Sequence, residues 1–232
     1  MVQSTGRRGL TIAYEGLDGA GKSTQIELIA ARLEAGGHRV LLQRLNANRL
    51  FKNQCRGLNE HDLIGPIEAA LMKAAELAGR LEMLQATVDG TIVIWDKYVA
   101  GSVASDVARG VPVAYGDAIA ASLPAPDLTV FHELTPPDAL QRTAAAGGPR
   151  VMESGLDIAF GSARRAHEMW AAGEIDAATV AQHFVAFQQR TLAAYEHYLP
   201  RERTLRLDAR QPPAALAEIA VHRVKELLVA FA

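Results

Sequence analysis

The sequence predicts an α/β fold in which a parallel sheet of five strands is covered by helices on both faces. Short β-prone runs alternate along the chain with longer segments of helical apolar spacing, a pattern typical of such sheets. With 232 residues, of which 49% are hydrophobic, the chain can bury one sizeable core. A glycine-rich segment joins the first strand to the first helix. We therefore expect residues 1–232 to form a single domain with a mobile lid.

The strands are predicted from apolar, β-branched runs that end at turn residues. In chain order they are Leu10–Tyr14, Arg39–Leu45, Thr91–Trp95, Leu128–Glu133 and Thr204–Asp208. The second strand contains three consecutive apolar residues, 40–42, which we expect to be buried. In parallel sheets of this kind, ligands bind beyond the carboxyl ends of the strands.

Helices are predicted between the strands and after the last one. In chain order they are Lys22–Glu34, Pro66–Val88, Val99–Leu123 with a break near Gly110–Pro112, Pro137–Ala145, Leu156–Tyr198 with a break near Gly173, and Pro213–Phe231. Apolar residues at helical spacing along the second helix predict a stripe facing the core. They are Ile67, Ala70, Leu71, Ala74, Leu77, Ala78, Leu81 and Leu84. The polar segment 46–65 before this helix is expected to line a site.

The segment Gly16–Thr24 matches a phosphate-binding loop, or P-loop: two glycines flank four residues, and a lysine and a hydroxyl residue follow. Such a loop aims backbone N–H groups and a helix N-terminus at phosphates. Lys22 would reach the β- and γ-phosphates of ATP, and the Ser23 hydroxyl would bind Mg²⁺. The expected cofactor-binding residues are Gly16, Asp18, Gly19, Ala20, Gly21, Lys22, Ser23, Thr24 and Arg142, the last against adenine or a phosphate.

Two carboxylates are candidates for direct roles. Asp96 ends a buried strand, where a second Mg²⁺-associated carboxylate of such folds lies, so we expect it opposite Ser23. His132 and Glu133 end the next strand and are weaker candidates, because a histidine at a strand end is more often structural. Asp18 lies inside the loop, where negative charge beside a triphosphate is unfavourable unless it has a task, such as accepting a hydrogen bond from a substrate hydroxyl.

Several arginines are candidates for phosphate contacts. Arg150 follows Gly147-Gly148-Pro149, a hinge composition, and lies in the expected lid at about residues 144–157. A lid that carries an arginine can close over phosphates and stabilise the charge of transfer. Arg44 and Arg80 are expected to face the acceptor phosphate.

These residues resemble the thymidylate kinase family of nucleoside monophosphate kinases. The segment Glu15–Gln25 is similar to that family's phosphate loop, and Asp96-Lys97-Tyr98 resembles its Asp-Arg-Tyr motif. Pro126–Thr129 resembles the start of its fourth strand, and Arg150 with Glu153–Asp157 resembles its bacterial-type lid. The resemblance implies a P-loop NTPase fold, ATP with Mg²⁺ as cofactors, and a small-molecule phosphate acceptor. It also implies catalysis by Lys22, Asp96 and Arg150, and a homodimer.

Departures from the family cluster on the acceptor side. Arg44–Asn48 replaces the family's Glu/Asp-Pro-Gly-Gly-Thr segment, Lys97 replaces an arginine, and Gly101–Asp106 lacks the aromatic and amide residues that would face thymine. Residues 161–183 look like an insertion. The expected acceptor residues are Asp18, Arg44, Arg80, Lys97, Tyr98, Ser102 and Asp106. We hypothesise that Asp106 accepts a hydrogen bond from an exocyclic amino group, which favours a pyrimidine or modified nucleotide other than thymidylate.

Composition excludes several other classes. A formal net charge of -2 gives no electrostatic footprint for nucleic acid or anionic membrane. No apolar run is long enough for a signal peptide or a membrane span. Cys55 is the only cysteine, so no internal disulfide can form, and we expect a cytoplasmic protein. Two alternatives remain: a kinase of a non-nucleotide or secondary-metabolite acceptor, and a nucleotide-binding ATPase or regulatory pseudo-kinase.

Overall fold

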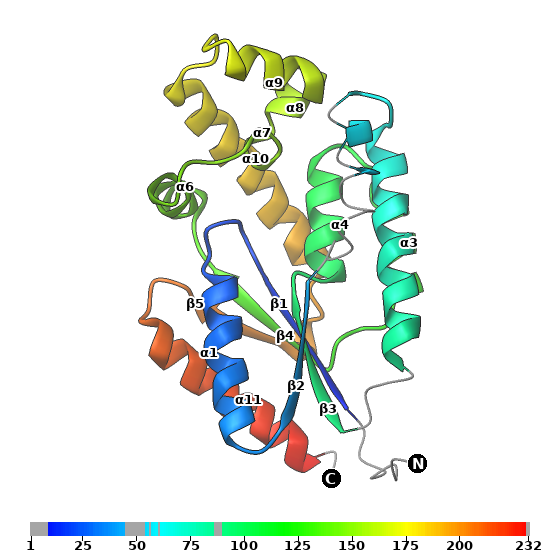
Figure 1. Ribbon diagram of the computed structural model, residues 1–232, viewed down its shortest axis with the longest axis vertical. Coiled ribbons are helices and arrows are strands. Elements are labelled where there is room, and N and C mark those ends of the chain that lie inside the picture. The colour runs from blue at the N-terminus through cyan, green and yellow to red at the C-terminus, as the bar shows by residue number, and fades with distance from the viewer. Residues whose placement is uncertain (1–8, 45–53, 56, 60, 86–89, 231–232) are drawn as a thin grey trace.

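The computed structural model describes residues 9–44, 54–55, 57–59, 61–85 and 90–230. It contains one five-stranded sheet, in the order β2-β3-β1-β4-β5, in which every neighbouring pair is parallel (Figure 1). The strands are β1 (Leu10–Gly16), β2 (Arg39–Arg44), β3 (Thr91–Asp96), β4 (Leu128–Glu133) and β5 (Thr204–Asp208). The predicted fold class and all five predicted strands are therefore confirmed.

The register of the sheet determines which strand ends lie next to each other. Tyr14 on β1 lies opposite Asp96 on β3, and Gly16 on β1 lies opposite His132 on β4. Because all strands run in the same direction, the loops that follow β1, β3 and β4 leave the sheet at one edge. The P-loop and Asp96 are thus brought together by the sheet itself.

Helices cover both faces of the sheet. They are α1 (Lys22–Ala35), α3 (Pro66–Gln85), α4 (Val99–Ala108), α5 (Val113–Ser122), α6 (Pro136–Ala145), α7 (Val151–Ser154), α8 (Leu156–Ala159), α9 (Ala163–Ala171), α10 (Ala177–Tyr198) and α11 (Pro213–Ala230). The helices α1 and α11 pack on one face, and α3, α4 and α10 lie on the other (Figure 1). Alternate residues of β1 feed the two cores: Ile12 and Tyr14 pack with α1 and α11, and Ala13 packs with α3 and α4.

The helix boundaries agree with the sequence pattern except in the region after the lid. The predicted break near residues 110–112 separates α4 from α5. The predicted helix Leu156–Tyr198 has two breaks: the predicted one near Gly173, between α9 and α10, and a further one between α8, which ends at Ala159, and α9. Ser162 caps α9 by accepting a hydrogen bond from the backbone N–H of Arg165 at 2.9 Å. The expected ends Leu45, Val88 and Phe231, and residues 45–53 of the polar segment, lie outside the described residues.

Two burial predictions are wrong. Leu42 on β2 is 46% exposed, and its neighbours in the predicted buried run are only half-buried. The strand β2 lies at the edge of the sheet and has a strand partner on one side only. On α3, Ala70 and Leu77 are buried, but Leu71 is 48% exposed. Leu71 follows Ala70 by one residue and therefore lies about 100° further around the helix.

Within the described residues, no helix combines the length and the apolar content that a membrane crossing requires.

Candidate functional site

The P-loop is shaped by backbone geometry that its glycines allow. Gly16 has a φ of 138°, and a Cβ atom there would lie 2.8 Å from the carbonyl oxygen of His132. Gly21 precedes α1 in a left-handed conformation and provides no side-chain cap. The first N–H groups of α1 therefore lack a capping side chain and can meet an anion, and the helix dipole adds partial positive charge. This end of α1 has the geometry and the partial charge that suit a phosphate group.

Lys22 is buried at the start of α1, and its side chain reaches back to the beginning of the P-loop. Its Nζ donates to the carbonyl oxygens of Gly16 at 2.9 Å and Leu17 at 2.8 Å. Burial lowers the pKa of Lys22, and the nearby Asp18 carboxylate opposes that shift. These contacts hold the ammonium group at the centre of the loop, where the motif requires it.

Ser23 and Asp96 lie together, as the sequence predicts. The Ser23 Oγ donates to Asp96 Oδ2 at 2.9 Å, and Arg44 Nε lies 3.5 Å from the same carboxylate oxygen. A hydroxyl and a carboxylate are hard oxygen donors of the kind that Mg²⁺ prefers. The described residues contain no group of three or more His, Cys, Asp or Glu side chains that could hold a metal alone. The donor set therefore fits Mg²⁺, which is commonly bound by one or two protein oxygens together with substrate phosphates.

Asp18 lies among positively charged groups. Burial acts to raise the pKa of Asp18, but the charges of Lys97, Lys22, Arg109 and Arg150 together outweigh it and lower the pKa. Asp18 therefore stays ionised inside the P-loop. A carboxylate compensated in this way can stand beside bound phosphates and still accept a hydrogen bond.

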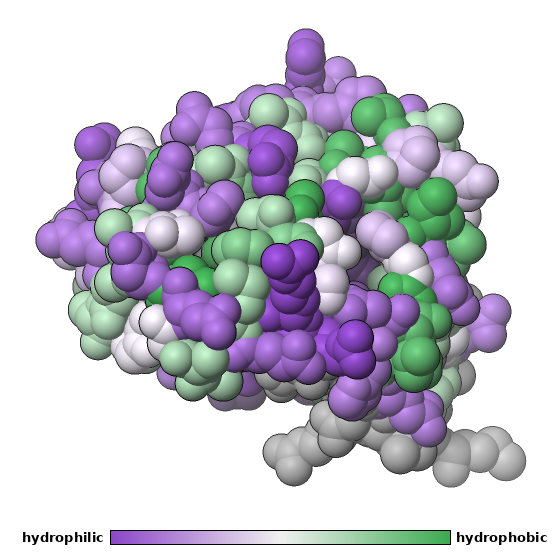
Figure 2. All heavy atoms as spheres, turned by 90° about the horizontal axis from the view of Figure 1, so that it is seen from above, coloured by the Kyte–Doolittle hydropathy of each residue, from purple (hydrophilic) through white to green (hydrophobic). Residues whose placement is uncertain are grey.

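The P-loop borders a cavity of about 990 Å³, which we call the loop cavity. Its walls include Asp18, Lys22–Thr24 and Asp96, together with Arg44 and Arg142. Arg142 Nη2 donates to the carbonyl oxygen of Ala209 at 2.8 Å, which fixes its guanidinium beside the loop. Seen from above, this end of the molecule carries mostly hydrophilic side chains, with hydrophobic patches among them (Figure 2).

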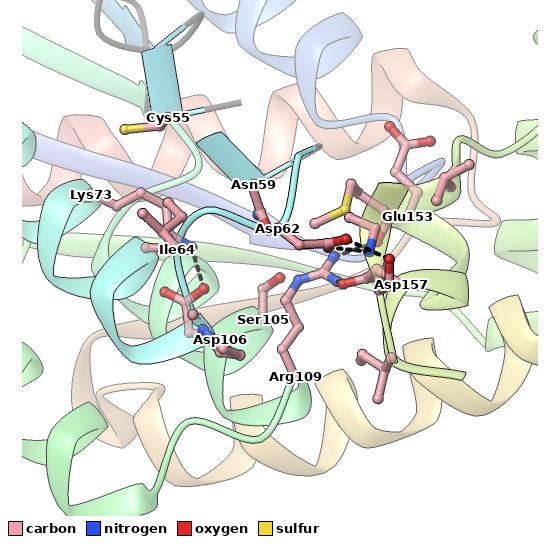
Figure 3. Close-up of a pocket in the computed structure, with 18 of the residues that line it drawn as sticks. Cys55, Asn59, Asp62, Ile64, Lys73, Ser105, Asp106, Arg109, Glu153 and Asp157 are labelled. Carbon is pink, nitrogen blue, oxygen red and sulfur yellow. Dashed lines mark hydrogen bonds and ion pairs between the residues drawn. The ribbon is translucent and has the colours of Figure 1, made fainter. Parts of the chain in front are cut away.

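A second cavity of about 670 Å³, which we call the α4 cavity, lies between α3, α4 and the helices α7, α8 and α9 (Figure 3). Ser102 and Asp106 of α4 line it, as expected of acceptor residues. Lys97, Arg150 and Glu153 line both the α4 cavity and the loop cavity. The two cavities therefore meet at these three residues, next to the P-loop.

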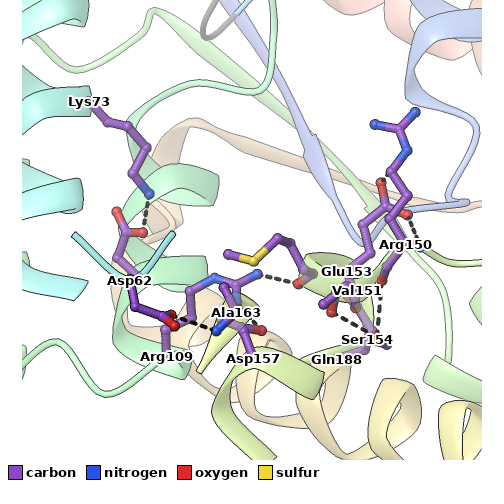
Figure 4. Close-up of polar contacts among 12 residues, drawn as sticks. Asp62, Lys73, Arg109, Arg150, Val151, Glu153, Ser154, Asp157, Ala163 and Gln188 are labelled. Carbon is purple, nitrogen blue, oxygen red and sulfur yellow. Dashed lines mark hydrogen bonds and ion pairs between the residues drawn. The ribbon is translucent and has the colours of Figure 1, made fainter. Parts of the chain in front are cut away.

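The polar segment before α3 and the 161–183 region both reach the α4 cavity. Asp62 Oδ1 accepts a hydrogen bond from the Ala163 N–H at 2.9 Å, and Asp62 Oδ2 accepts one from the Ser162 hydroxyl (Figure 4). Gly161 and His167 also line the cavity, as do Cys55 and Asn59 from the other side. The described part of the polar segment therefore lines the α4 cavity, and the start of the 161–183 region lines the same cavity.

Two residues that the sequence analysis did not single out form ion pairs in the α4 cavity. Lys73 of α3 pairs with Asp106 of α4 (Figure 3). Arg109 donates from Nη1 to both carboxylate oxygens of Asp157, at 2.9 and 2.7 Å, and from Nη2 to the Met152 carbonyl oxygen. Only the fold brings these partners together, since they are far apart in the chain.

Tyr98 and Arg80 are placed differently from the prediction that they bind the acceptor. The Tyr98 side chain is buried in the core, its ring packs against Trp95, and its hydroxyl donates to the Pro124 carbonyl oxygen at 2.9 Å. Arg80 pairs with Glu76 and donates to the Arg44 carbonyl oxygen at 2.6 Å. Neither residue lines the loop cavity or the α4 cavity. Their contacts instead tie β3 and β2 to the neighbouring elements.

Glu15 is a buried carboxylate that the sequence analysis passed over. Its Oε1 accepts hydrogen bonds from the backbone N–H groups of Tyr98 and Gly101, both at 3.0 Å. Its Oε2 accepts one from the Tyr195 hydroxyl at 3.1 Å. Glu15 therefore joins β1 to the start of α4 and to α10. The available signal was a charged residue at the end of an apolar strand, directly before the P-loop.

His132 and Glu133, the weaker candidates, have structural partners. His132 Nδ1 lies 2.9 Å from the Ala20 carbonyl oxygen, to which it donates. Glu133 pairs with Arg206 at 3.0 Å.

Comparison with known proteins places the chain beside one group of enzymes. The family model described as thymidylate kinase matches residues 14–183. A thymidylate kinase of Xanthomonas campestris pv. campestris (strain B100) is 36% identical over 147 residues, covering 60% of this chain. The match spans 62% of that relative's own length.

Two archaeal relatives align over longer stretches. A probable thymidylate kinase of Pyrococcus abyssi is 31% identical over 159 residues, covering 65% of this chain and 78% of the relative. A protein of Saccharolobus solfataricus named probable thymidylate kinase 2 is 27% identical over 209 residues, covering 88% of this chain and 90% of the relative.

Proposed function

This chain belongs to the thymidylate kinase family, and from that premise we propose that it transfers the γ-phosphoryl group of ATP to a nucleoside monophosphate. The observation that carries the proposal is the meeting of the loop cavity and the α4 cavity at Lys97, Arg150 and Glu153. A donor bound at the P-loop and an acceptor bound along α4 would have their phosphates face each other at this junction.

The residues around the P-loop would supply hydrogen-bond donors and positive charge to the triphosphate of ATP. The backbone N–H groups at the start of α1 and the Lys22 ammonium would bind its phosphates. Ser23 and Asp96 would hold Mg²⁺, which neutralises phosphate charge when it is bound. In the transfer, a bond forms between an acceptor phosphate oxygen and the γ-phosphorus, and the bond to the β-phosphate oxygen breaks. Positioning and charge compensation supply most of the rate.

The lid supplies the remaining cation. The Arg150 side chain is 72% exposed and points away from the Arg109–Asp157 pair (Figure 4). Since it lines both cavities, Arg150 would contact the transferred group from the lid. Lys97 lies at the same junction and Asp18 lies in the adjoining loop cavity, where the two residues would orient the acceptor phosphate or an adjacent hydroxyl.

We propose a homodimer as well. Leu71 is 48% exposed on α3, and a partner helix packed along α3 would cover it.

The proposal is tested by replacing the P-loop lysine. Purified protein with ATP and Mg²⁺ should release ADP in the presence of one or more nucleoside monophosphates, and Lys22→Ala should lower kcat by at least about a hundredfold. Lys225→Ala, at an exposed position on α11, is the matched control and should leave kcat unchanged.

The same assay separates the alternatives. Release of ADP without any acceptor would indicate an ATPase, and transfer only to a small molecule that is not a nucleotide would indicate a different kinase. Full phosphoryl transfer by Lys22→Ala would refute the assignment of the P-loop as the donor site.

A further inference from the structure

The wall of the α4 cavity carries a buried pair of opposite charges. The Lys73 ammonium on α3 donates to Asp106 Oδ1 on α4, and both residues line the cavity (Figure 3). The exposed fractions of the two side chains are 23% and 7%. The pair therefore presents one acceptor group and one donor group, side by side, to whatever occupies the cavity.

Stability alone is a weak reason for this pair. Removing two charges from water costs more than an isolated buried ion pair usually returns, and apolar residues of similar volume often stabilise as well or better. Apolar residues also pack between α3 and α4, among them Leu77 of α3 and Val99 and Val103 of α4. A charged pair kept at the cavity end of an apolar interface is better explained by a ligand that it contacts.

The pair lies at the right depth for a nucleobase. The helix α4 begins at Val99, two residues after the junction residue Lys97, and Asp106 is seven residues further along the helix. Seven residues of helix span about 10 Å, which is the scale of a sugar and a base. Ser102 lines the cavity between them, within reach of a sugar.

We propose that Lys73 and Asp106 read the edge of the acceptor's base, and that this base carries an exocyclic amino group. Asp106 would accept a hydrogen bond from the amino group, and Lys73 would donate to the neighbouring ring nitrogen or carbonyl oxygen. Thymine and uracil instead have an N–H flanked by two carbonyl oxygens, and one of these would face a carboxylate oxygen at close range. This inference rests on the proposed function and names the acceptor class of the same site.

The test is a kinetic comparison of acceptors. With ATP held saturating, kcat/KM is measured for dAMP, dCMP, dGMP, dTMP and dUMP. We expect at least one amino-bearing nucleotide to exceed dTMP and dUMP by about tenfold or more. Asp106→Asn should lower kcat/KM for the preferred acceptor by about tenfold to a hundredfold and reduce the preference, with KM for ATP unchanged. Asp117→Asn, which removes an exposed carboxylate on α5, should leave the preference unchanged.

A charge exchange separates recognition from a structural tie. The double variant Lys73→Asp with Asp106→Lys keeps an ion pair between α3 and α4 but inverts the pattern offered to the base. Recognition predicts a folded protein, with its thermal transition retained, in which the parental preference is lost. Restoration of the parental preference by the exchange would show a structural tie and overturn the inference.

The other outcomes are equally decisive. A parent enzyme that prefers dTMP or dUMP, or an Asp106→Asn variant with an unchanged preference, would overturn the inference and leave the kinase assignment intact. A parent enzyme that phosphorylates none of the five nucleotides but transfers to another small molecule would overturn the proposed acceptor class and the inference with it.

Discussion

His132 shows how a single buried group supports the P-loop. Its Nδ1–H donates to the Ala20 carbonyl oxygen, so the neutral ring carries its other lone pair on Nε2, which has no hydrogen-bond partner among the described residues. Burial lowers the pKa of His132, and the nearby charges of Lys22 and Arg142 lower it further. The ring is therefore neutral where it holds the loop against β4.

This low pKa predicts a pH-dependent stability. Below the ordinary pKa of 6.5, the unfolded chain binds a proton at His132 that the folded chain does not. The free energy of unfolding should therefore fall as the pH drops from about 6.5 towards the lowered pKa, at about 1.4 kcal/mol per pH unit from this residue. Urea unfolding of the parent and of His132→Asn, between about pH 5 and pH 8, measures the difference.

The asparagine variant keeps a donor for Ala20 but has no titrating ring, so its stability should fall less steeply below pH 6.5. The control is His61→Asn, at an exposed position before α3, which should keep the parental slope. Identical slopes for the parent and His132→Asn would contradict the explanation.

At the scale of elements, the lid is held by its neighbours. Arg109, at the end of α4, binds both oxygens of Asp157, and its guanidinium lies 4.5 Å from the centre of the Phe187 ring on α10. Gln188 of α10 donates to the Glu153 carbonyl oxygen at 3.0 Å. Because Arg150 directly precedes α7, these contacts set where its side chain can reach.

Weakening the contact between Arg109 and Asp157 should lower kcat, because Arg150 would then be held less firmly. Arg109→Lys loses the guanidinium that joins Asp157 through Nη1 to the Met152 carbonyl oxygen through Nη2. We expect kcat to fall by about tenfold or more with a smaller change in KM for ATP. Asp157→Asn, which alters the partner and leaves the guanidinium in place, should change kcat in the same direction. Steady-state kinetics measures both.

The matched control for this contact is Arg223→Lys. Arg223 pairs with Glu226 at 2.8 Å on the exposed side of α11, so the same substitution there should leave kcat unchanged. Parental kcat in both Arg109→Lys and Asp157→Asn would exclude a positioning role for the contact.

At the scale of the whole molecule, three elements from distant parts of the chain meet at Gly101. A Cβ atom at this position of α4 would lie 2.2 Å from Glu15 Oε2 on β1 and 2.5 Å from the Tyr195 hydroxyl oxygen on α10. Since Glu15 and Tyr195 are buried and joined by a hydrogen bond, their side chains have little room to move. The absence of a side chain at Gly101 lets α4 approach the sheet closely.

Two glycine-to-alanine substitutions in helices should therefore change the free energy of unfolding in opposite directions. Gly101→Ala should lower the free energy of unfolding by about 1–3 kcal/mol, because the added methyl group overpacks a buried polar contact. Gly79→Ala on α3 has nothing within 4 Å of its new methyl group and should raise the free energy of unfolding by up to about 1 kcal/mol. Urea unfolding of both variants checks the prediction, and equal effects would contradict it.

The elements of this fold could be predicted because their signals are local. Strand–helix alternation indicates a parallel sheet, and all five strands were identified from apolar runs within their own segments. The burial of single residues was less predictable. Leu42 and Leu71 have the residue type and spacing of core positions, but exposure depends on what packs against them, and β2 lies at a sheet edge.

The sequence by itself determined the donor half of the proposed site, because the P-loop is contiguous and its expected chemistry depends on adjacent residues. The helix N-terminus, Lys22 and Ser23 follow each other directly, and the sheet register brings Asp96 beside them. Only the tertiary structure decided the acceptor half. In that half, Lys73 meets Asp106 across 33 residues and Arg109 meets Asp157 across 48. In the core beside it, Glu15 meets Tyr195 across 180. No local pattern encodes such pairs, because their strength comes from burial and distance, which exist only once the helices have packed.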